Sequence, residues 1–208
     1  MVSSWTDSLA RYDYSANLSK FVYKAEHFEG FTRPSFNSEI NRSNTIEFEN
    51  AFRTIITEQQ FSKYSIIGEV CFWKTYTKPD PHSSTNKILN RVKYQFNFQK
   101  FCLALNNLAK NSTLEQFQQF RLTCGQPNGF AIPITFLSFY DPEKYPMADA
   151  IIADWWRKNK SRFGYGNSPN FTPQGMISGR TENIKNNWSA YLKWTNFCRK
   201  YANIISKK

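Results

Sequence analysis

Apolar residues recur at helical spacing along most of the chain, and this pattern constrains the fold more than any other feature. Over 44–60 and 87–109 they mark one face of a helix, and we predict one helix over each range. The positions are Phe48, Phe52, Ile55 and Ile56 in the first range, and Tyr94, Phe98, Phe101, Cys102, Leu105 and Leu108 in the second. Asn44 and Glu47 resemble a capping pair for the first helix. Alternating strand patterns are rare, so the sequence predicts an all-α fold with no sheet of more than two short strands.

Four further helices are predicted in the second half of the chain. Ser112 and Glu115 form an S-x-x-E capping box that opens a short helix. A turn at 124–133 leads to an apolar helix over 134–140, and another helix opens at Asp149. The last covers 183–205, after a loop-like segment at 163–181. The expected apolar positions are Leu114, Phe117 and Phe120, then Met147, Ile151, Ile152 and Trp155, then Trp188, Tyr191, Leu192, Thr195, Cys198, Ala202 and Ile205.

The chain is long enough for one domain with a sizeable core, and it contains no linker and no repeat. We therefore predict a single helical domain over 1–208, with its core at 44–205 and N-terminal helices within 1–43. No run of about 18 apolar residues exists, so no membrane span is expected. The first residues lack the pattern of a signal peptide, so we expect a cytoplasmic protein, and a monomer.

The charge balance favours an anionic partner. Lys and Arg number 27 against 16 Asp and Glu, which gives a net charge of +11 and a sequence pI near 9.5. Such an excess favours phosphate backbones through counterion release. The alternatives are a solubilising excess of charge or attraction to anionic lipid, but no amphipathic basic anchor or lipidation motif is present. Nucleic acid is therefore the expected partner.

Metal and cofactor sites have little support in the sequence. The four cysteines lie 31, 22 and 74 residues apart without a CxxC or CxxH pair, and the chain has only two histidines. Bulky apolar neighbours make these cysteines candidates for reduced core residues. We expect no metal, no cofactor and no Cys/His or Ser/His/Asp catalytic triad. The residues are Cys71, Cys102, Cys124, Cys198, His27 and His82.

The turn at 124–133 is the first candidate for a contact with DNA. Two helices joined by a tight glycine turn can present backbone N–H groups to a phosphate, because glycine allows close approach and positive φ. In this chain the contacting residues are expected to be Asn128, Gly129, Phe130 and Ala131. Many helical proteins contain such a turn, so taken alone it indicates DNA only weakly.

The order of motifs from this turn onward resembles the helix-hairpin-helix Gly/Pro–Asp superfamily of DNA glycosylases. In that family a hairpin, a helix and a loop lead to a Pro-x-x-Asp-like segment with a catalytic Asp. Here the segment 145–152 reads YPMADAII, with Asp149 in the position of the catalytic residue. Gly129 matches the first hairpin glycine, and Ala131 lies near the second. Upstream, IITEQQFS at 55–62 resembles the family's Gln-containing helix end, which implies that Gln60 lies near the DNA.

The resemblance covers roughly residues 44–205 by element order, and it implies a helical base-excision glycosylase-like fold. It also implies double-stranded DNA as the partner and cleavage of the N-glycosidic bond of a flipped base. A carboxylate such as Asp149 would stabilise the developing sugar cation or activate water. Asp149 at a helix N-terminus is expected to stay ionised, although it could also be only a helix cap. Gln60 could likewise be an ordinary polar residue at a helix end.

Aromatic and basic residues around Asp149 complete the predicted site. Trp73 and Tyr145 are expected walls of the base pocket, while Trp155 and Trp156 are expected to form core plus interface. Phosphate contacts are expected from the basic run at 157–162, which could instead be a solvated face. Its contacting residues are Arg157, Lys158 and Lys160.

The chain also departs from the family pattern. The hairpin lacks Gly-x-Gly, Ala150 follows Asp149 in place of His or Thr, and no cluster cysteines follow. No Lys occurs from 125 to 141, where bifunctional members carry the lyase Lys, and Lys144 is the nearest other nucleophile. We therefore expect a monofunctional glycosylase. The alternatives are a catalytically silent relative that binds DNA or a protein, and a relative that modifies or transfers bases.

Overall fold

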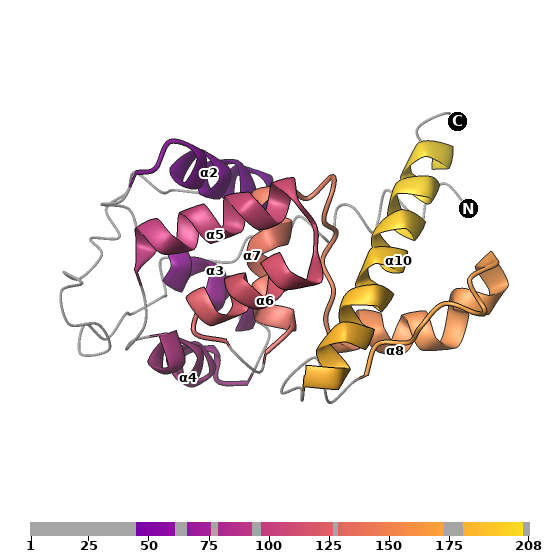
Figure 1. Cartoon of the computed structure of the whole chain (residues 1–208). Helices are drawn as coiled ribbons and strands as arrows, with labels where there is room; N and C mark the ends of the chain where they lie inside the picture. The colour runs from indigo at the N-terminus through magenta and orange to yellow at the C-terminus, as the bar shows by residue number, and fades with distance from the viewer. Residues whose placement is uncertain are drawn as a thin grey trace. The chain divides into compact units, whose positions relative to one another are not determined.

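The computed structural model describes residues 45–60, 66–75, 79–92, 97–126, 129–172 and 181–205. Within these ranges it contains eight α-helices and one 3-10 helix, and no strand (Figure 1). The all-α prediction is confirmed. None of the described helices is long and apolar enough to cross a membrane. The helices predicted in 1–43 and the cap predicted at Asn44 lie outside the described residues.

The chain divides into two compact units, unit 1 from Met1 to Tyr94 and unit 2 from Gln95 to Lys208. The described part of unit 1 holds α2 (Thr45–Thr57), α3 (Ile66–Thr75) and α4 (Pro81–Val92). Unit 2 holds α5 (Phe98–Lys110), α6 (Leu114–Thr123), α7 (Ala131–Tyr140), α8 (Ala150–Asn159), the 3-10 helix η5 (Lys160–Phe163) and α10 (Thr181–Ile205). The prediction of a single domain stays a prediction.

In unit 1, the apolar face predicted for α2 is buried at all four positions, Phe48, Phe52, Ile55 and Ile56. Helix α3 is buried on nearly every side, as a central core helix is. Its last residue, Thr75, shares a hydrogen bond of 2.7 Å between hydroxyl oxygens with Thr85 of α4. Helix α4 begins at Pro81, where the absent proline N–H is not needed, and Asp80 Oδ1 accepts a bond from the Ser83 amide at 2.9 Å.

The single helix predicted over 87–109 is wrong. Helix α4 ends at Val92, and α5 begins after Asn97, whose side chain accepts a hydrogen bond from the Lys100 amide at 2.9 Å. Asn97 has extended backbone angles, φ −127° and ψ 113°, as an N-cap requires. The apolar stripe holds within α5, where Phe98, Phe101, Cys102, Leu105 and Leu108 are buried. The spacing of apolar residues therefore did not show that a new helix begins after Asn97.

The predicted capping box of α6 is displaced by one residue. The N-cap is Thr113, whose hydroxyl accepts a hydrogen bond from the Gln116 amide at 3.2 Å. Ser112 hydrogen-bonds the Tyr145 hydroxyl instead. The helix itself is confirmed, with Phe117 and Phe120 fully buried.

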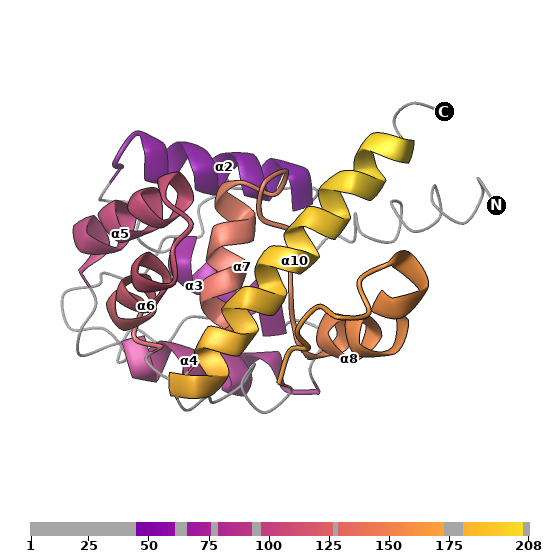
Figure 2. The same ribbon diagram turned by 45° about the vertical axis from the view of Figure 1, so that its right-hand side comes forward.

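Helix α10 packs against two other helices of unit 2, α6 and α8. Its first half packs on α6, where Trp188 stacks on Phe117 with ring centroids 4.5 Å apart. Its second half packs on α8, where Trp156 lies 5.8 Å from Trp194 and 5.6 Å from Phe197, again between centroids. Figure 2 shows α8 running beside α10. The core of unit 2 is therefore largely aromatic.

The apolar face predicted for α8 is wrong. Ile151 is 78% exposed and Trp155 is 36% exposed, whereas Ala153 and Trp156 are the residues this helix buries. The rings of Trp156 and Trp155 both contact Trp194 and Phe197 of α10, but only Trp156 is fully buried there. Both α10 partners were absent from the predicted apolar face, and Ala202, which was included, is exposed.

Candidate functional site around Asp149 and the basic residues of unit 2

Asp149 is the N-cap of α8. Its Oδ1 accepts hydrogen bonds from the amides of Ile151 at 2.9 Å and Ile152 at 3.0 Å, and its backbone is extended. These bonds satisfy two of the N–H groups that a helix leaves open at its start. The positive end of the helix dipole also favours the ionised carboxylate. The structure thus gives Asp149 a capping role, and its catalytic role stays a prediction.

The loop that leads to Asp149 is tied to the end of α5. The hydroxyl of Tyr145 donates to the Ala109 carbonyl at 2.8 Å, and Lys144 Nζ donates to the same carbonyl at 2.6 Å. The Lys144 ammonium also lies 5.0 Å from the centre of the Tyr145 ring. Tyr145 is buried, so the structure gives this predicted pocket wall a role in holding the loop. The two donors satisfy an open carbonyl at the C-terminus of α5.

The same loop is tied to α10 just before Asp149. The Tyr191 hydroxyl donates to the Pro146 carbonyl at 3.1 Å, and the Trp194 indole N–H donates to the Met147 carbonyl at 3.0 Å. Burial raises the pKa of Tyr191 well above its ordinary value, so this hydroxyl remains a donor. Bonds from α5 and α10 therefore fix the position of the Asp149 carboxylate.

The turn between α6 and α7 is closed by its own hydrogen bonds. Gly125 has φ 63°, the left-handed conformation that glycine adopts at helix ends. The Gly129 amide donates to the Gln126 carbonyl at 3.0 Å, and the Gly129 carbonyl accepts a bond from Arg121 Nε at 2.6 Å. Burial lowers the pKa of Arg121 to about 10. The turn is thus fixed from inside unit 2.

This geometry changes what the predicted hairpin residues can contribute. Gly129 and Phe130 are buried, and the Phe130 ring packs 4.9 Å from Phe117 between centroids. Ala131 is half-buried at the first position of α7, and Asn128 lies outside the described residues. The Phe130 ring therefore serves packing, and the first turn of α7 offers a phosphate at most the amides of Ala131 and Ile132, because Pro133 has no N–H. The helix-hairpin-helix assignment itself stays a prediction.

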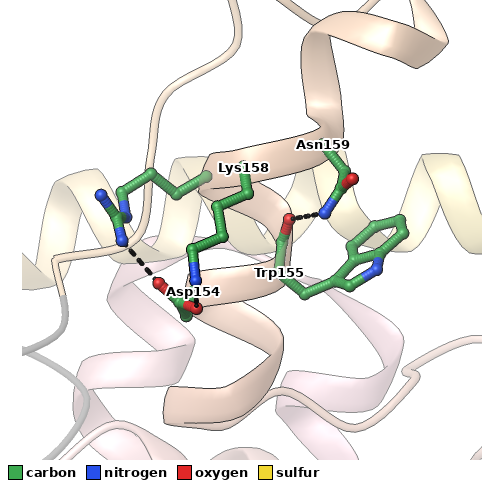
Figure 3. Close-up of polar contacts among 5 residues, drawn as sticks. Asp154, Trp155, Lys158 and Asn159 are labelled. Atoms are coloured by element: carbon green, nitrogen blue, oxygen red, sulfur yellow. Dashed lines mark hydrogen bonds and ion pairs between the residues drawn. The ribbon is translucent and has the colours of Figure 1, made fainter.

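The basic run after α8 separates into exposed and buried residues. Asp154 pairs with Arg157 Nη2 at 2.5 Å through Oδ1 and with Lys158 Nζ at 2.6 Å through Oδ2 (Figure 3). Hydrogen bonds from Lys158 and Arg157 hold the pKa of Asp154 below its ordinary value. Both cations are more than half exposed. Lys160 is only 7% exposed, and its Nζ donates to the Ser168 carbonyl, so it braces the following loop.

Helix α10 adds exposed cations that the sequence predictions missed. Lys193 lines a shallow depression of about 360 Å³ together with the loop at 164–169. In the described residues from 150 onward, the only acidic residues are Asp154 and Glu182. This imbalance was visible in the sequence and could have indicated a basic surface. The exposed cations of α8, η5 and α10, called the unit 2 cations below, are Arg157, Lys158, Arg162, Lys185, Lys193, Arg199 and Lys200.

Two predicted site residues belong to unit 1. Gln60 follows α2, its amide donates to the Ile55 carbonyl at 3.0 Å, and its Nε2 donates to Glu58 Oε2 at 2.5 Å. Its Oε1 is buried and accepts no hydrogen bond from any described residue. Trp73 is buried in α3. The placement of both residues next to Asp149 stays a prediction.

The cysteines are free thiols in protected surroundings. Cys71, Cys102 and Cys124 are buried and Cys198 is half-buried. Burial raises the pKa of Cys102 to about 11 and that of Cys124 and Cys198 to about 12, which keeps these thiols protonated and poorly nucleophilic. Within the described ranges no three His, Cys, Asp or Glu side chains gather as they would around a metal ion.

Comparisons with known protein families, with curated proteins and with solved structures find no match to this chain. Its functional assignment therefore depends on its own residues and their geometry.

Proposed function

We propose that this protein is a monofunctional DNA glycosylase of the helix-hairpin-helix Gly/Pro–Asp type. The observation that carries the proposal is the position of Asp149. A carboxylate held by two backbone amides stands at the start of a helix, behind a loop that bonds from α5 and α10 hold in place. The order of α6, turn, α7, loop and Asp149 also follows the order of motifs that the resemblance implies.

In the proposed reaction the bond between C1′ of the sugar and the base nitrogen breaks, and its electron pair leaves with the base. Positive charge then develops at the sugar, where the Asp149 carboxylate stabilises it. Water adds its oxygen to C1′, and its proton goes to the carboxylate or the departing base. The products are a free base and an abasic site, and no covalent enzyme intermediate is required.

The proposed partner is double-stranded DNA, held through its phosphates by the unit 2 cations. Arg157 and Lys158 lie at the C-terminal end of the helix that Asp149 begins, and both are exposed. Arg162 follows in η5 and is also exposed. Counterion release on phosphate binding supplies the affinity, so binding should weaken steeply with salt.

A second candidate is a catalytically silent relative that binds DNA. It is favoured by the same two hydrogen bonds at Asp149, because capping alone is a sufficient reason for an Asp at this position. The two candidates differ in whether a base is released.

The test is a panel of duplexes that carry different damaged or modified bases, scored for abasic sites after alkali. Asp149→Asn should keep the fold and DNA binding and lose excision about 100-fold or more. The matched control is Asp154→Asn, which removes the same charge from an exposed position of the same helix and should keep excision. Binding without release of any base would favour the silent relative. A modified nucleotide that stays in the strand would indicate a base-modifying enzyme.

A further inference from the structure

We infer that the exposed face of Trp155 is a stacking platform for an unpaired nucleobase, held there by phosphate contacts to neighbouring cations. This inference rests on the proposed DNA partner and adds a contact with bases that are not paired. It concerns a surface of α8 and η5 that is separate from the Asp149 carboxylate.

The ring of Trp155 packs against three other aromatic rings, yet the residue remains partly exposed. It stacks on Phe163 with centroids 5.9 Å apart and planes 28° from parallel. It also meets Trp194 at 5.9 Å and Phe197 at 5.8 Å. These contacts fix its orientation, yet 36% of the residue remains exposed. A rigid aromatic ring with an exposed face needs little ordering when a base stacks on it.

The neighbouring indoles show that Trp155 differs from a core tryptophan. Trp156 is fully buried and donates its indole N–H to the Pro169 carbonyl at 3.2 Å. Trp194 donates its indole N–H to the Met147 carbonyl at 3.0 Å. Among the described residues, the indole nitrogen of Trp155 donates to none. The indole N–H groups of Trp156 and Trp194 thus each hold a backbone carbonyl, whereas Trp155 contacts its neighbours through its ring alone.

Exposed cations lie close to Trp155 along the chain, at Arg157, Lys158 and Arg162. Asn159 donates from its side chain to the Trp155 carbonyl at 2.9 Å, and both side chains lie on the same side of α8 (Figure 3). The Asn159 side chain also accepts a bond from Arg162 Nη1 at 3.4 Å, so this exposed guanidinium is linked through Asn159 to the backbone of Trp155. Lys158 is more than half exposed, and its ammonium pairs with Asp154 (Figure 3). An aromatic face beside cations fits a base and its flanking phosphates.

Charge distinguishes this occupant from an apolar protein surface. Ile151, one turn before Trp155, is also exposed, so the patch has an apolar part. Interface cores between proteins are nevertheless depleted in charged residues. Here the seven unit 2 cations outnumber the two acidic residues among the described residues from 150 onward. A nucleic acid fits this surface, because its bases can stack on the Trp155 ring and its phosphates can bind the cations.

The experiment compares Trp155→Phe with Trp155→Leu in the full-length chain. Both variants replace the indole with a smaller apolar side chain, but only Phe keeps an aromatic face. Affinity for a labelled 15-mer of thymidine and for a labelled blunt duplex is measured by fluorescence anisotropy at several salt concentrations. Leu122→Ala removes an exposed apolar side chain from α6 and serves as the matched control. Thermal melting checks that all three variants fold.

We expect Trp155→Leu to weaken binding to the single strand by about 5- to 150-fold and to leave duplex affinity within about twofold. Trp155→Phe should retain most of the affinity, and Leu122→Ala should match the wild type. The salt dependence should not change in any variant, because every phosphate-binding cation is kept. If Trp155→Leu binds the single strand like the wild type, or if the wild type forms a dimer that Trp155→Leu abolishes, the inference is wrong. A wild-type protein that binds neither DNA would overturn the proposed function as well.

Discussion

The guanidinium of Arg121 donates from Nε to the backbone carbonyl of Gly129 across 2.6 Å and thereby joins the last turn of α6 to the turn before α7. Arg121 is buried, and its charged group lies 5.9 Å from the centre of the Phe117 ring. The local fold of this turn therefore depends on a side chain that the sequence analysis did not single out.

Replacing Arg121 with Ala should lower the free energy of unfolding by about 3 kcal/mol, because a hydrogen bond to a charged group is lost and the buried Gly129 carbonyl is left without it. Urea denaturation measures the change. Arg162→Ala, at an exposed position, is the control and should stay within about 0.5 kcal/mol of the wild type. Equal stability of the two variants would contradict a structural role for Arg121.

Asp149 allows its capping role to be separated from its proposed catalytic role. Asn caps a helix about as well as Asp, so Asp149→Asn should keep the stability of the wild type, whereas Asp149→Ala should lose about 1 kcal/mol. Thermal melts measure this difference. Excision should fall in both variants if the carboxylate acts on the sugar. Full activity in Asp149→Asn would leave Asp149 as a helix cap only.

The basic run should divide into residues that bind DNA and one that stabilises the fold. Arg157→Ala with Lys158→Ala should reduce the salt dependence of DNA binding by roughly one unit for each phosphate that is no longer neutralised. Lys160→Met should instead lower the free energy of unfolding by about 1–3 kcal/mol, since it leaves the Ser168 carbonyl without its donor. Salt titrations and urea denaturation measure the two effects. A Lys160→Met protein of normal stability but altered salt dependence would reverse this assignment.

Borohydride should trap no covalent complex with DNA. A Schiff base needs a free amine near the sugar, and no Lys occurs from 125 to 141. The first Lys after this segment is Lys144, and its amine donates a hydrogen bond to the Ala109 carbonyl. Strands should therefore break only after alkali or heat, as denaturing gels can show. If trapping is efficient in the wild type and disappears in Lys144→Met, the protein is a lyase.

Stability should fall in alkali because buried thiols keep protons that the unfolded chain releases. Burial raises the pKa of Cys198 to about 12 from an ordinary value of 9.0, so its contribution is complete below about pH 9 and is lost as the pH rises toward 12. At about pH 10.5 Cys198→Ala should lose less stability relative to pH 7.5 than the wild type does, by about 1–2 kcal/mol. Urea denaturation in the presence of a reductant measures this difference, and an identical loss in both proteins would contradict it.

The helical spacing of apolar residues predicted most of the helices but not their ends. The stripe of α5 was correct from Phe98 to Leu108, and the break before it depended on one side-chain bond at Asn97. Similarly, Ser112 and Thr113 both carry a hydroxyl that can cap a helix. Ser112 hydrogen-bonds Tyr145, and Thr113 is the residue that caps α6. Such choices depend on tertiary partners, which a single sequence does not show.

The candidate site was predictable in composition and less so in geometry. Arg157 and Lys160 look alike in the sequence, but Lys160 begins the 3-10 turn that directs its side chain to Ser168, and Arg157 stays exposed on α8. The partial exposure of Trp155 and the full burial of Trp156 were likewise undetermined, since both rings contact α10 and the sequence does not show which of them the loop at 164–169 covers.

The aromatic contacts between α8 and α10 also give the chain an internal spectroscopic reporter. The ring centroids of Trp155 and Trp156 both lie within 6 Å of the centroid of Trp194, and all three lie within 6 Å of Phe197. At such distances the excited states of the indoles exchange energy and couple. Near-ultraviolet ellipticity and tryptophan emission should therefore respond first to any loosening of α10 from α8, so that the integrity of this half of unit 2 can be followed by light, without a label.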